Sequence, residues 1–324
     1  MDNTYLLDLM ICLISGLRGN ERLELVKKFD REEDFLPLSK KDIENFIGRS
    51  LKGRNWTMSQ IRSMAEKDLA AVQRTGIRLV SWRENTYPPL LREIFDPPAL
   101  LFCRGALPNP EKPLIAVVGT RKPTSAAGAR AFALGRELGE AGIPVVSGLA
   151  LGIDSMAHRG NLEGKAPTIA VLGSGPDMIY PSSNRPLARR ILENGGLILS
   201  EYPPGTRPYK SNFPARNRII SGLSRGTVVV EAPLHSGALI TARFALDQNR
   251  DLWVENTGVT SPRGGGTASL AGEGAAVISS ARDILLDWNI TSDKDSEQAE
   301  KRELFQNNGV GLASSMAASL NIKL

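Results

Sequence analysis

The chain has 324 residues, of which 41% are apolar, and its 40 basic residues against 35 acidic ones give a formal net charge of +5. This length and apolar content favour about two or three folded domains and exclude a disordered chain. The positive balance favours a polyanionic partner through counterion release, although charge alone does not identify one.

The two cysteines, Cys12 and Cys103, have neither zinc-ligand spacing nor a disulfide framework. We therefore expect a cytoplasmic protein without a metal site. The apolar stretch over residues 6–17 contains Asp8 and falls short of the roughly 20 residues that cross a bilayer. It predicts an amphipathic core helix rather than a membrane anchor.

Residues 1–80 are predicted to form a small helical domain without a convincing strand. Their apolar residues recur at helical spacing, as in Leu6, Leu9, Met10, Leu13 and Ile14. Residues 14–19 (ISGLRG) have the pattern of a helix-hairpin-helix turn, in which glycines let a helix N-terminus approach a phosphate. A tight turn that serves only packing is the alternative.

Residues 81–113 are rich in proline, which forbids long helices and favours an extended connector between domains. From residue 114 to about 288, helical segments alternate with short apolar runs at 114–118, 144–146, 168–172, 197–199, 227–230 and 251–254. That alternation predicts an α/β domain with a mostly parallel sheet and helices on both faces. Residues 289–324 are predicted to be a polar linker and a short C-terminal helical tail.

The first strand of this sheet is followed by Gly119, Thr120 and Arg121, and a helix is predicted to start near residue 126. A glycine at a strand's carboxyl end, with hydroxyl and basic groups beside a helix N-terminus, suits a phosphate. A simple turn capped by Ser125 is the alternative. The segment lacks G-x-G-x-x-G, so we expect no dinucleotide cofactor.

The second turn has Ser147 and Gly148 after a strand and Asp154 before a helix. Gly148 lets backbone amides face a ligand, and Asp154 is placed to cap the helix. His158 follows as a candidate base, but no nucleophile or metal-ligand spacing accompanies it. We therefore interpret His158 as a structural residue that hydrogen-bonds nearby groups.

A basic block between residues 207 and 225 is the strongest local signal. It contains no acidic residue and five cations, Arg207, Lys210, Arg216, Arg218 and Arg225, with Tyr209 and Phe213 among them. Cations that track phosphates, together with an aromatic face for a base, hold single strands without reading their sequence. The block therefore predicts single-stranded DNA binding, and a merely solvated basic face is the alternative.

Glu231 follows the next strand, and Ser236 and Gly237 precede the next helix. We expect Glu231 to pair with Arg216 or Arg218 rather than to act as an acid, because a carboxylate beside arginines usually pairs with them. Ser236 and Gly237 are expected to support the same site.

Six ordered blocks within residues 87–258 carry a family resemblance. They are 118–121 (VGTR), 147–154 (SGLALGID) with Ala157 and His158, 180–181 (YP) with Asn184, 200–203 (SEYP), 213–220 (FPARNRII), and 230–232 (VEA) with 236–241 (SGALIT). In this order and spacing they resemble the DprA/Smf family of bacterial DNA-processing proteins.

The resemblance implies an extended Rossmann-like fold, a sterile-alpha-motif-like N-terminal domain and a homodimer formed through the Rossmann-like domain. It also implies a protein that is not an enzyme, protects incoming single-stranded DNA and loads the RecA recombinase onto it during natural transformation and recombination. Position by position, it implies DNA contacts in the first two turns and the basic block, at Gly119, Thr120, Arg121, Ser147, Gly148, Lys210, Phe213, Arg216, Asn217 and Arg218.

Two segments depart from the family pattern. Residues 255–258 read Glu-Asn-Thr-Gly where the family usually has Val-Pro-Gly, and Ala268 stands where the family usually has asparagine. The lost asparagine puts one polar contact of the cleft, or packing on the dimer side, in doubt.

The alternative function is a Rossmann-like nucleotide-processing enzyme of the nucleoside monophosphate phosphoribohydrolase type. Such an enzyme is expected to show Pro-Gly-Gly-x-Gly-Thr-x-x-Glu. Residues 264–267 (GGGT) match only part of that signature, and no glutamate stands three residues beyond Thr267.

Overall fold

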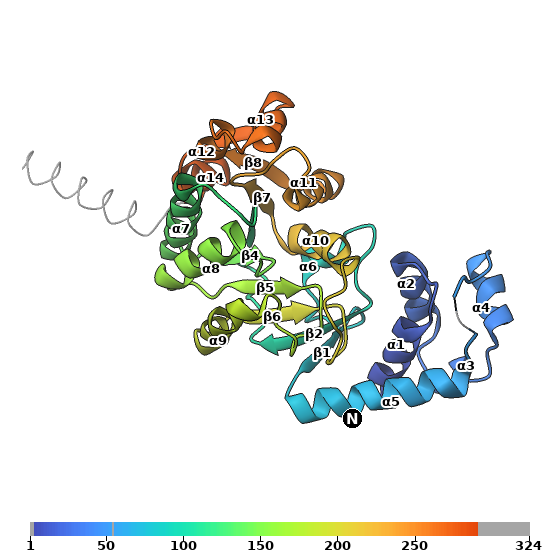
Figure 1. Ribbon diagram of the computed structural model, residues 1–324. Coiled ribbons are helices and arrows are strands. Elements are labelled where there is room, and N and C mark those ends of the chain that lie inside the picture. Colours follow the sequence, from blue (N-terminus) through green and yellow to red (C-terminus); the bar gives the residue numbers. More distant parts are fainter. Residues whose placement is uncertain (1–2, 54, 291–324) are drawn as a thin grey trace, which may run out of the picture. The chain divides into compact units, whose positions relative to one another are not determined.

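The computed structural model describes residues 3–53 and 55–290 of the chain (Figure 1). The chain divides into two compact units, the first ending at Ser279 and the second beginning at Ser280 with α14 (Ala281–Asp287). The tail predicted over residues 291–324 lies outside the described residues. Within the described ranges, no helix combines the length and the apolar character needed to pass through a bilayer.

Helices fill the described chain up to residue 75, as their periodicity predicts. They are α1 (Asn3–Leu13), α2 (Gly19–Lys28), α3 (Glu32–Phe35), α4 (Lys40–Ile47) and α5 (Met58–Thr75). The N-caps of α4 and α5 are Ser39 and Thr57, whose hydroxyls accept hydrogen bonds from backbone amides three residues on. Both helices end at a glycine in the left-handed region, Gly48 (φ 73°) and Gly76 (φ 64°).

The strands of the first unit form one sheet, which has nine strands among the described residues in the order β1-β2-β6-β5-β4-β3-β7-β8-β9. They are β1 (Arg78–Ser81), β2 (Leu100–Gly105), β3 (Ile115–Val118), β4 (Val145–Ser147), β5 (Ile169–Leu172), β6 (Leu197–Ser200), β7 (Gly226–Val229), β8 (Asp251–Glu255) and β9 (Ala276–Ile278). β3 to β9 pair in parallel, whereas β1 pairs antiparallel with β2, and β2 with β6. All six predicted strands are present as β3 to β8, so the mostly parallel α/β fold is confirmed.

Two strands lie where the sequence predicted a helical segment or a connector. β1 begins at Arg78, directly after α5, and β2 lies inside the proline-rich segment 81–113. Pro98 and Pro108 flank β2 without interrupting it, so its backbone pairs on both edges. The expectation of an extended connector was therefore wrong for residues 100–105, which add an interior strand to the sheet. The third unpredicted strand, β9, has only three residues, and two of them are exposed.

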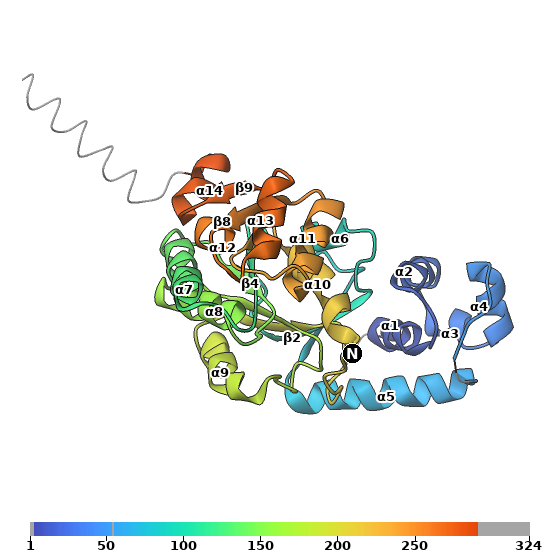
Figure 2. The same ribbon diagram turned by 45° about the horizontal axis from the view of Figure 1, so that its top comes forward.

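Helices cover both faces of the sheet (Figure 2). α7 (Ser125–Glu140), α8 (Ile153–Glu163) and α9 (Arg185–Glu193) lie on one face. α6 (Pro89–Arg92), α10 (Asn212–Leu223) and α11 (Gly237–Asp247) lie on the other. The short η1 (Ser182–Asn184) precedes α9, and α12 (Asn256–Val259) and α13 (Gly265–Gly272) follow β8.

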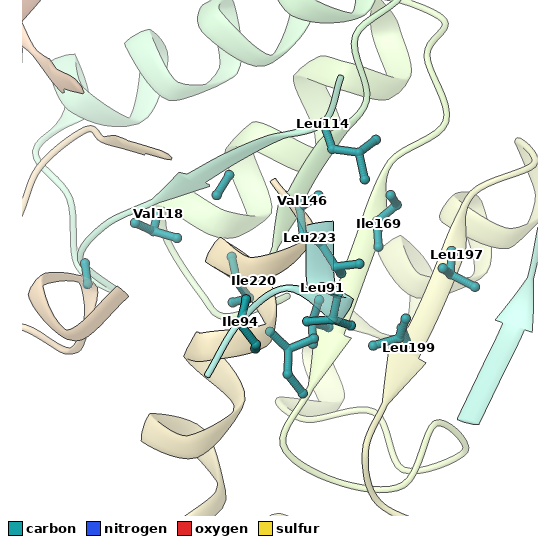
Figure 3. Close-up of a cluster of buried hydrophobic side chains, with 14 of the residues drawn as sticks. Leu91, Ile94, Leu114, Val118, Val146, Ile169, Leu197, Leu199, Ile220 and Leu223 are labelled. Carbon is teal, nitrogen blue, oxygen red and sulfur yellow. The ribbon is translucent and has the colours of Figure 1, made fainter. Parts of the chain in front are cut away.

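Alternate residues of β5 show why both faces are covered. Ile169 belongs to the buried cluster that includes Ile220 of α10 (Figure 3). Leu172, whose side chain points the opposite way from the pleated strand, packs instead with Ile191 of α9. A strand that is apolar on both faces requires a helix on each side, which is what the continuous apolar runs predict.

Candidate nucleic-acid interface

The strand order places a crevice at the carboxyl edge of the sheet. The chain enters the parallel part at β3, continues outward through β4, β5 and β6, and then returns to the other side of β3 with β7. In open α/β sheets, ligands bind outside the carboxyl ends of the strands at such a switch point. The turns after β3, β4 and β7 all meet there.

A cleft of about 830 Å³ opens at this edge. Its walls include nine of the predicted site residues, namely Gly119, Thr120, Arg121, Asp154, Phe213, Arg216, Asn217, Ser236 and Gly237. Three basic or titratable residues that the sequence did not single out, Lys122, His235 and Arg263, also line it. A smaller adjoining pocket of about 60 Å³ is lined by Gly148, Arg121, Tyr180 and Phe213, among others.

Hydrogen bonds to Glu231 fix the backbone of the first turn. The Thr120 amide donates to the Glu231 carbonyl (2.7 Å), and the Glu231 carboxylate accepts from the Thr124 amide (2.8 Å) and hydroxyl (3.0 Å) and from the Ser261 hydroxyl. The expected pairing of Glu231 with an arginine of the basic block is therefore wrong. Thr124, rather than Ser125, caps α7 through the Ala127 amide. A carboxylate fixed in this way shapes the turn and leaves the Arg121 side chain exposed.

The second turn is built around Asp154. Its carboxylate accepts from the Gly148 amide (3.1 Å) and the Ala150 amide (3.3 Å), while Gly152 is the N-cap residue of α8. We expected Asp154 to cap the helix, but its carboxylate instead holds the backbone of the preceding loop. Ser147 is fully buried and donates to the Val117 carbonyl (2.7 Å), so its hydroxyl does not reach the cleft.

His158 is a buried structural residue in this geometry. Its Nδ1 lies 2.7 Å from the Thr168 hydroxyl, which itself donates to the Val145 carbonyl (2.7 Å). Burial, together with the nearby charge of Arg216, lowers the pKa of His158 to about 3. The imidazole is therefore neutral at physiological pH and braces α8 against the sheet.

Arg216 forms the floor of the cleft. Only 5% of the residue is exposed, and its Nη1 donates to the carbonyls of Gly148 (2.9 Å) and Val171. Burial lowers the pKa of Arg216 to about 10, although the charge of Asp154 acts in the opposite direction. A Cβ on residue 148 would lie 2.5 Å from Arg216 Nη2, so this position requires glycine for close approach.

Arg218, which was expected to meet phosphate, faces away from this cleft. Its guanidinium donates to both carboxylate oxygens of Glu201 (2.7 and 2.9 Å) and to Asp96 (3.0 Å). Burial alone would lower the pKa of Arg218, but the neighbouring Glu201 outweighs it and the pKa is raised. Arg218 lines a different cavity, of about 920 Å³, between α10 and the N-terminal helices. It holds α10 in place and is not positioned to bind a ligand beside Arg121.

A wall of one cation and two aromatic rings stands where the cleft meets the smaller pocket: Arg121 and Phe213 line both, and Tyr180 lines the smaller one. The Arg121 Cζ atom lies 5.7 Å from the centroid of the Phe213 ring, and the Tyr180 ring centroid lies 5.6 Å from that of Phe213. Asn217 donates to the Gly237 carbonyl (3.1 Å) and so ties α10 to the start of α11. Ser236 caps α11 through the Ala238 amide, and that helix N-terminus faces the cleft.

The other cations of the basic block are dispersed. Lys210 and Arg207 are exposed in the loop before α10, outside the residues that line the cleft. Arg225 stands just before β7 and therefore at the amino edge of the sheet, opposite the cleft. Charge density along the sequence thus overstated the number of cations at the site.

Sequence reasoning assigned no role in the site to four residues that line it, Tyr180, Lys122, His235 and Arg263. Tyr180 and Lys122 could have been found, because Tyr180 stands in the 180–181 block of the resemblance and Lys122 directly follows Arg121. Arg263 gave no local signal. Its guanidinium reaches the Lys122 carbonyl (3.2 Å) across 141 positions of sequence.

Gly19, in the helix-hairpin-helix-like turn, faces a carboxylate of the chain itself. A Cβ on Gly19 would lie 1.5 Å from Asp96 Oδ1, so this position needs glycine for close packing of the turn against the chain itself. The packing interpretation of this turn fits the structure better than phosphate binding.

The two departures from the family pattern lie outside the cleft lining. Glu255 accepts from the Thr257 amide (2.8 Å), caps α12 and pairs with Arg130 at 3.3 Å. Gly258 is required there, because a Cβ would lie 1.6 Å from the Val230 carbonyl oxygen. Ala268 is exposed on α13. The missing asparagine therefore removes no polar group from the cleft wall.

Residues 78–289, more than half of the chain, match the family model described as DNA recombination-mediator protein A. The chain belongs to this DprA/Smf family. A Smf protein from Synechocystis sp. is 44% identical over 219 residues, which cover 66% of this chain and 55% of that protein. The DNA processing protein DprA of Bacillus subtilis is 42% identical over 217 residues, which cover 67% of this chain and 73% of that protein.

Solved structures of DprA proteins share this fold. The X-ray structure of Streptococcus pneumoniae DprA superposes with a TM-score of 0.72 at 34% identity, covering 88% of this chain and 98% of that one. A Helicobacter pylori DprA, whose structure describes a single-stranded DNA binding mode, superposes with a TM-score of 0.58 at 32% identity, covering 65% of this chain and 95% of that one. DprA/Smf membership thus agrees with the segments that carried the resemblance.

Proposed function

We propose that this protein binds single-stranded DNA in the cleft at the carboxyl edge of its sheet and acts as a binding protein rather than an enzyme. The observation that carries the proposal is the Arg121–Phe213–Tyr180 wall. A guanidinium beside two rings offers one group for a phosphate and flat faces for bases. The description of the Helicobacter pylori relative as a single-strand binder supports the same assignment.

The floor of the cleft supports binding without chemistry. Arg216 and Asp154 are engaged with backbone groups of the second turn, and His158 is buried behind it. These groups give the cleft a rigid shape, so Arg121, Lys122 and Arg263 are the cations left to meet the strand from its rim.

Membership of the DprA/Smf family supports a more specific role. The protein protects incoming single strands in the cytoplasm, loads RecA recombinase onto them during natural transformation and recombination, and works as a homodimer.

Fluorescence anisotropy of a labelled oligothymidylate, measured across salt concentrations, tests the binding site. We expect Arg121→Gln to weaken binding and to reduce the slope of log K against log salt by about 0.7, the value for one lost phosphate contact on a single strand. Arg225→Gln, which removes an equal charge at the opposite edge of the sheet, is the matched control. Equal effects of the two substitutions would refute the cleft as the binding site.

A further inference from the structure

The rim of the cleft is bonded directly to the start of α9. The Asn184 side-chain amide donates to the Leu149 carbonyl (2.9 Å) and to the Ser155 hydroxyl (3.0 Å). Both acceptors belong to the second turn and to the first turn of α8 that follows it. The loop from Tyr180 to α9 is therefore a fixed continuation of the cleft wall.

Two arginines extend from this point along one side of α9. Arg185 and Arg189 are both exposed, and residues four apart lie on one helix face about 6 Å apart along the axis. Arg190 points to another side of the helix, where it pairs with Glu163 of α8 at 3.3 Å. The face formed by Arg185 and Arg189 is thus a basic side of α9 that is separate from the exposed Arg190–Glu163 pair.

Arg185 occupies an unfavourable position for a cation. It is the first residue of α9, whose nine described residues include no acidic one in the first turn. A positive side chain at the positive end of the helix dipole is disfavoured unless an anion is present. Asn184 makes no cap hydrogen bond, because its side chain is bonded to the cleft rim. The Asn184 and Arg185 amides already donate to the Pro181 and Ser182 carbonyls, and Pro186 has no amide proton. The Arg185 guanidinium is therefore the group at this helix end that favours an external anion.

Tyr180 links the cleft to this helix end. Its side chain is 47% exposed, and its ring is paired with that of Phe213. The two rings line the smaller pocket of about 60 Å³ together with Arg121 and Gly148. Tyr180 directly precedes Pro181, η1 and α9 in the chain, so a base stacked on its exposed ring would lie toward the start of α9.

We propose that Arg185 and Arg189 bind the phosphates of a single strand that leaves the cleft over Tyr180. We call Arg185 and Arg189 the α9 tract. This proposal rests on the proposed function, because the tract would bind the same strand that the cleft binds. It gives the protein a second contact region that strands too short to leave the cleft do not reach.

Two oligothymidylates test the tract, one of about 6 nucleotides that occupies the cleft alone and one of about 20 that extends beyond it. We expect Arg185→Gln/Arg189→Gln to weaken binding of the long strand about tenfold and to reduce its salt slope by about 1.4, the value for two phosphates. Binding of the short strand should change less than twofold. The control Arg190→Gln/Arg225→Gln removes the same charge, and thermal unfolding verifies that both variants are folded.

Each outcome decides the matter. An equal loss for short and long strands, or equal losses in the two double variants, would show a general charge effect and overturn the tract. Unchanged long-strand binding in Arg185→Gln/Arg189→Gln overturns the tract but leaves the cleft intact. Failure of the wild-type protein to bind either strand overturns the proposed function itself.

Discussion

Arg218 should contribute to folding rather than to DNA contact. Arg218→Gln leaves the Glu201 carboxylate without the guanidinium that binds both of its oxygens. Breaking a buried ion pair by removing one partner costs about 3–5 kcal/mol. The Glu201 and Asp96 side chains keep 17% and 36% exposure, so we expect the lower end, about 3 kcal/mol. With an m-value of about 3 kcal/mol/M, the urea midpoint should fall by about 1 M.

Two further variants sharpen this test. Arg218→Gln/Glu201→Gln also removes the unpaired Glu201 carboxylate and should recover part of the free energy of unfolding. Arg121→Gln, at an exposed position, should change the free energy of unfolding by less than about 0.5 kcal/mol. Suppose instead that Arg218→Gln unfolds at the wild-type urea concentration and loses single-strand affinity as Arg121→Gln does. Arg218 would then be a phosphate ligand, and the account of α10 would be wrong.

Three more predictions address the cleft and its support. Phe213→Ala should lower single-strand affinity by about 1–3 kcal/mol in anisotropy titrations, because a stacking face is lost; unchanged affinity would exclude stacking. Gly148→Ala should lower the free energy of unfolding by about 1–3 kcal/mol by displacing the Arg216 guanidinium, whereas Gly237→Ala, whose Cβ meets no described atom within 4 Å, should not. His158 has a pKa of about 3 in the native protein and 6.5 in the unfolded chain, so below pH 6.5 the unfolded chain binds a proton that the native protein does not. The free energy of unfolding is therefore fully retained above pH 6.5 and falls as the pH is lowered toward 3. From pH 7.5 to 5.5 this loss should be about 1.4 kcal/mol in urea unfolding, and a His158→Asn variant that keeps the same pH dependence would contradict it.

The sequence predicted the parallel sheet well because buried parallel strands are continuous apolar runs. It missed β2, because the prolines around residues 100–105 obscured a strand that they only flank. It missed β1 because four residues directly after an 18-residue helix carry little pattern of their own. Short strands are defined by their partners across the sheet, and that information is not local.

The turns of the candidate site were predictable, whereas the directions of its arginines were not. Glycines and hydroxyls at strand ends mark where a ligand can approach, and those turns do converge on the cleft. Arg216 and Arg218 lie two residues apart on α10 and therefore point to different sides. Their partners, such as Asp96 at 122 positions from Arg218, appear together only in three dimensions. A charge count therefore predicts the presence of a basic surface but not which cations are free to bind.

Photo-crosslinking can show which residues of the protein contact the bound single strand. A single strand carrying photoreactive thymine analogues, irradiated on the full-length protein and mapped by mass spectrometry, should form adducts on Phe213 or Tyr180 at the carboxyl edge of the sheet. Substitution of Arg121 by glutamine should reduce those adducts. Adducts concentrated at the amino edge around Arg225 or on the N-terminal helices, with none on the two rings, would exclude the cleft as the binding site.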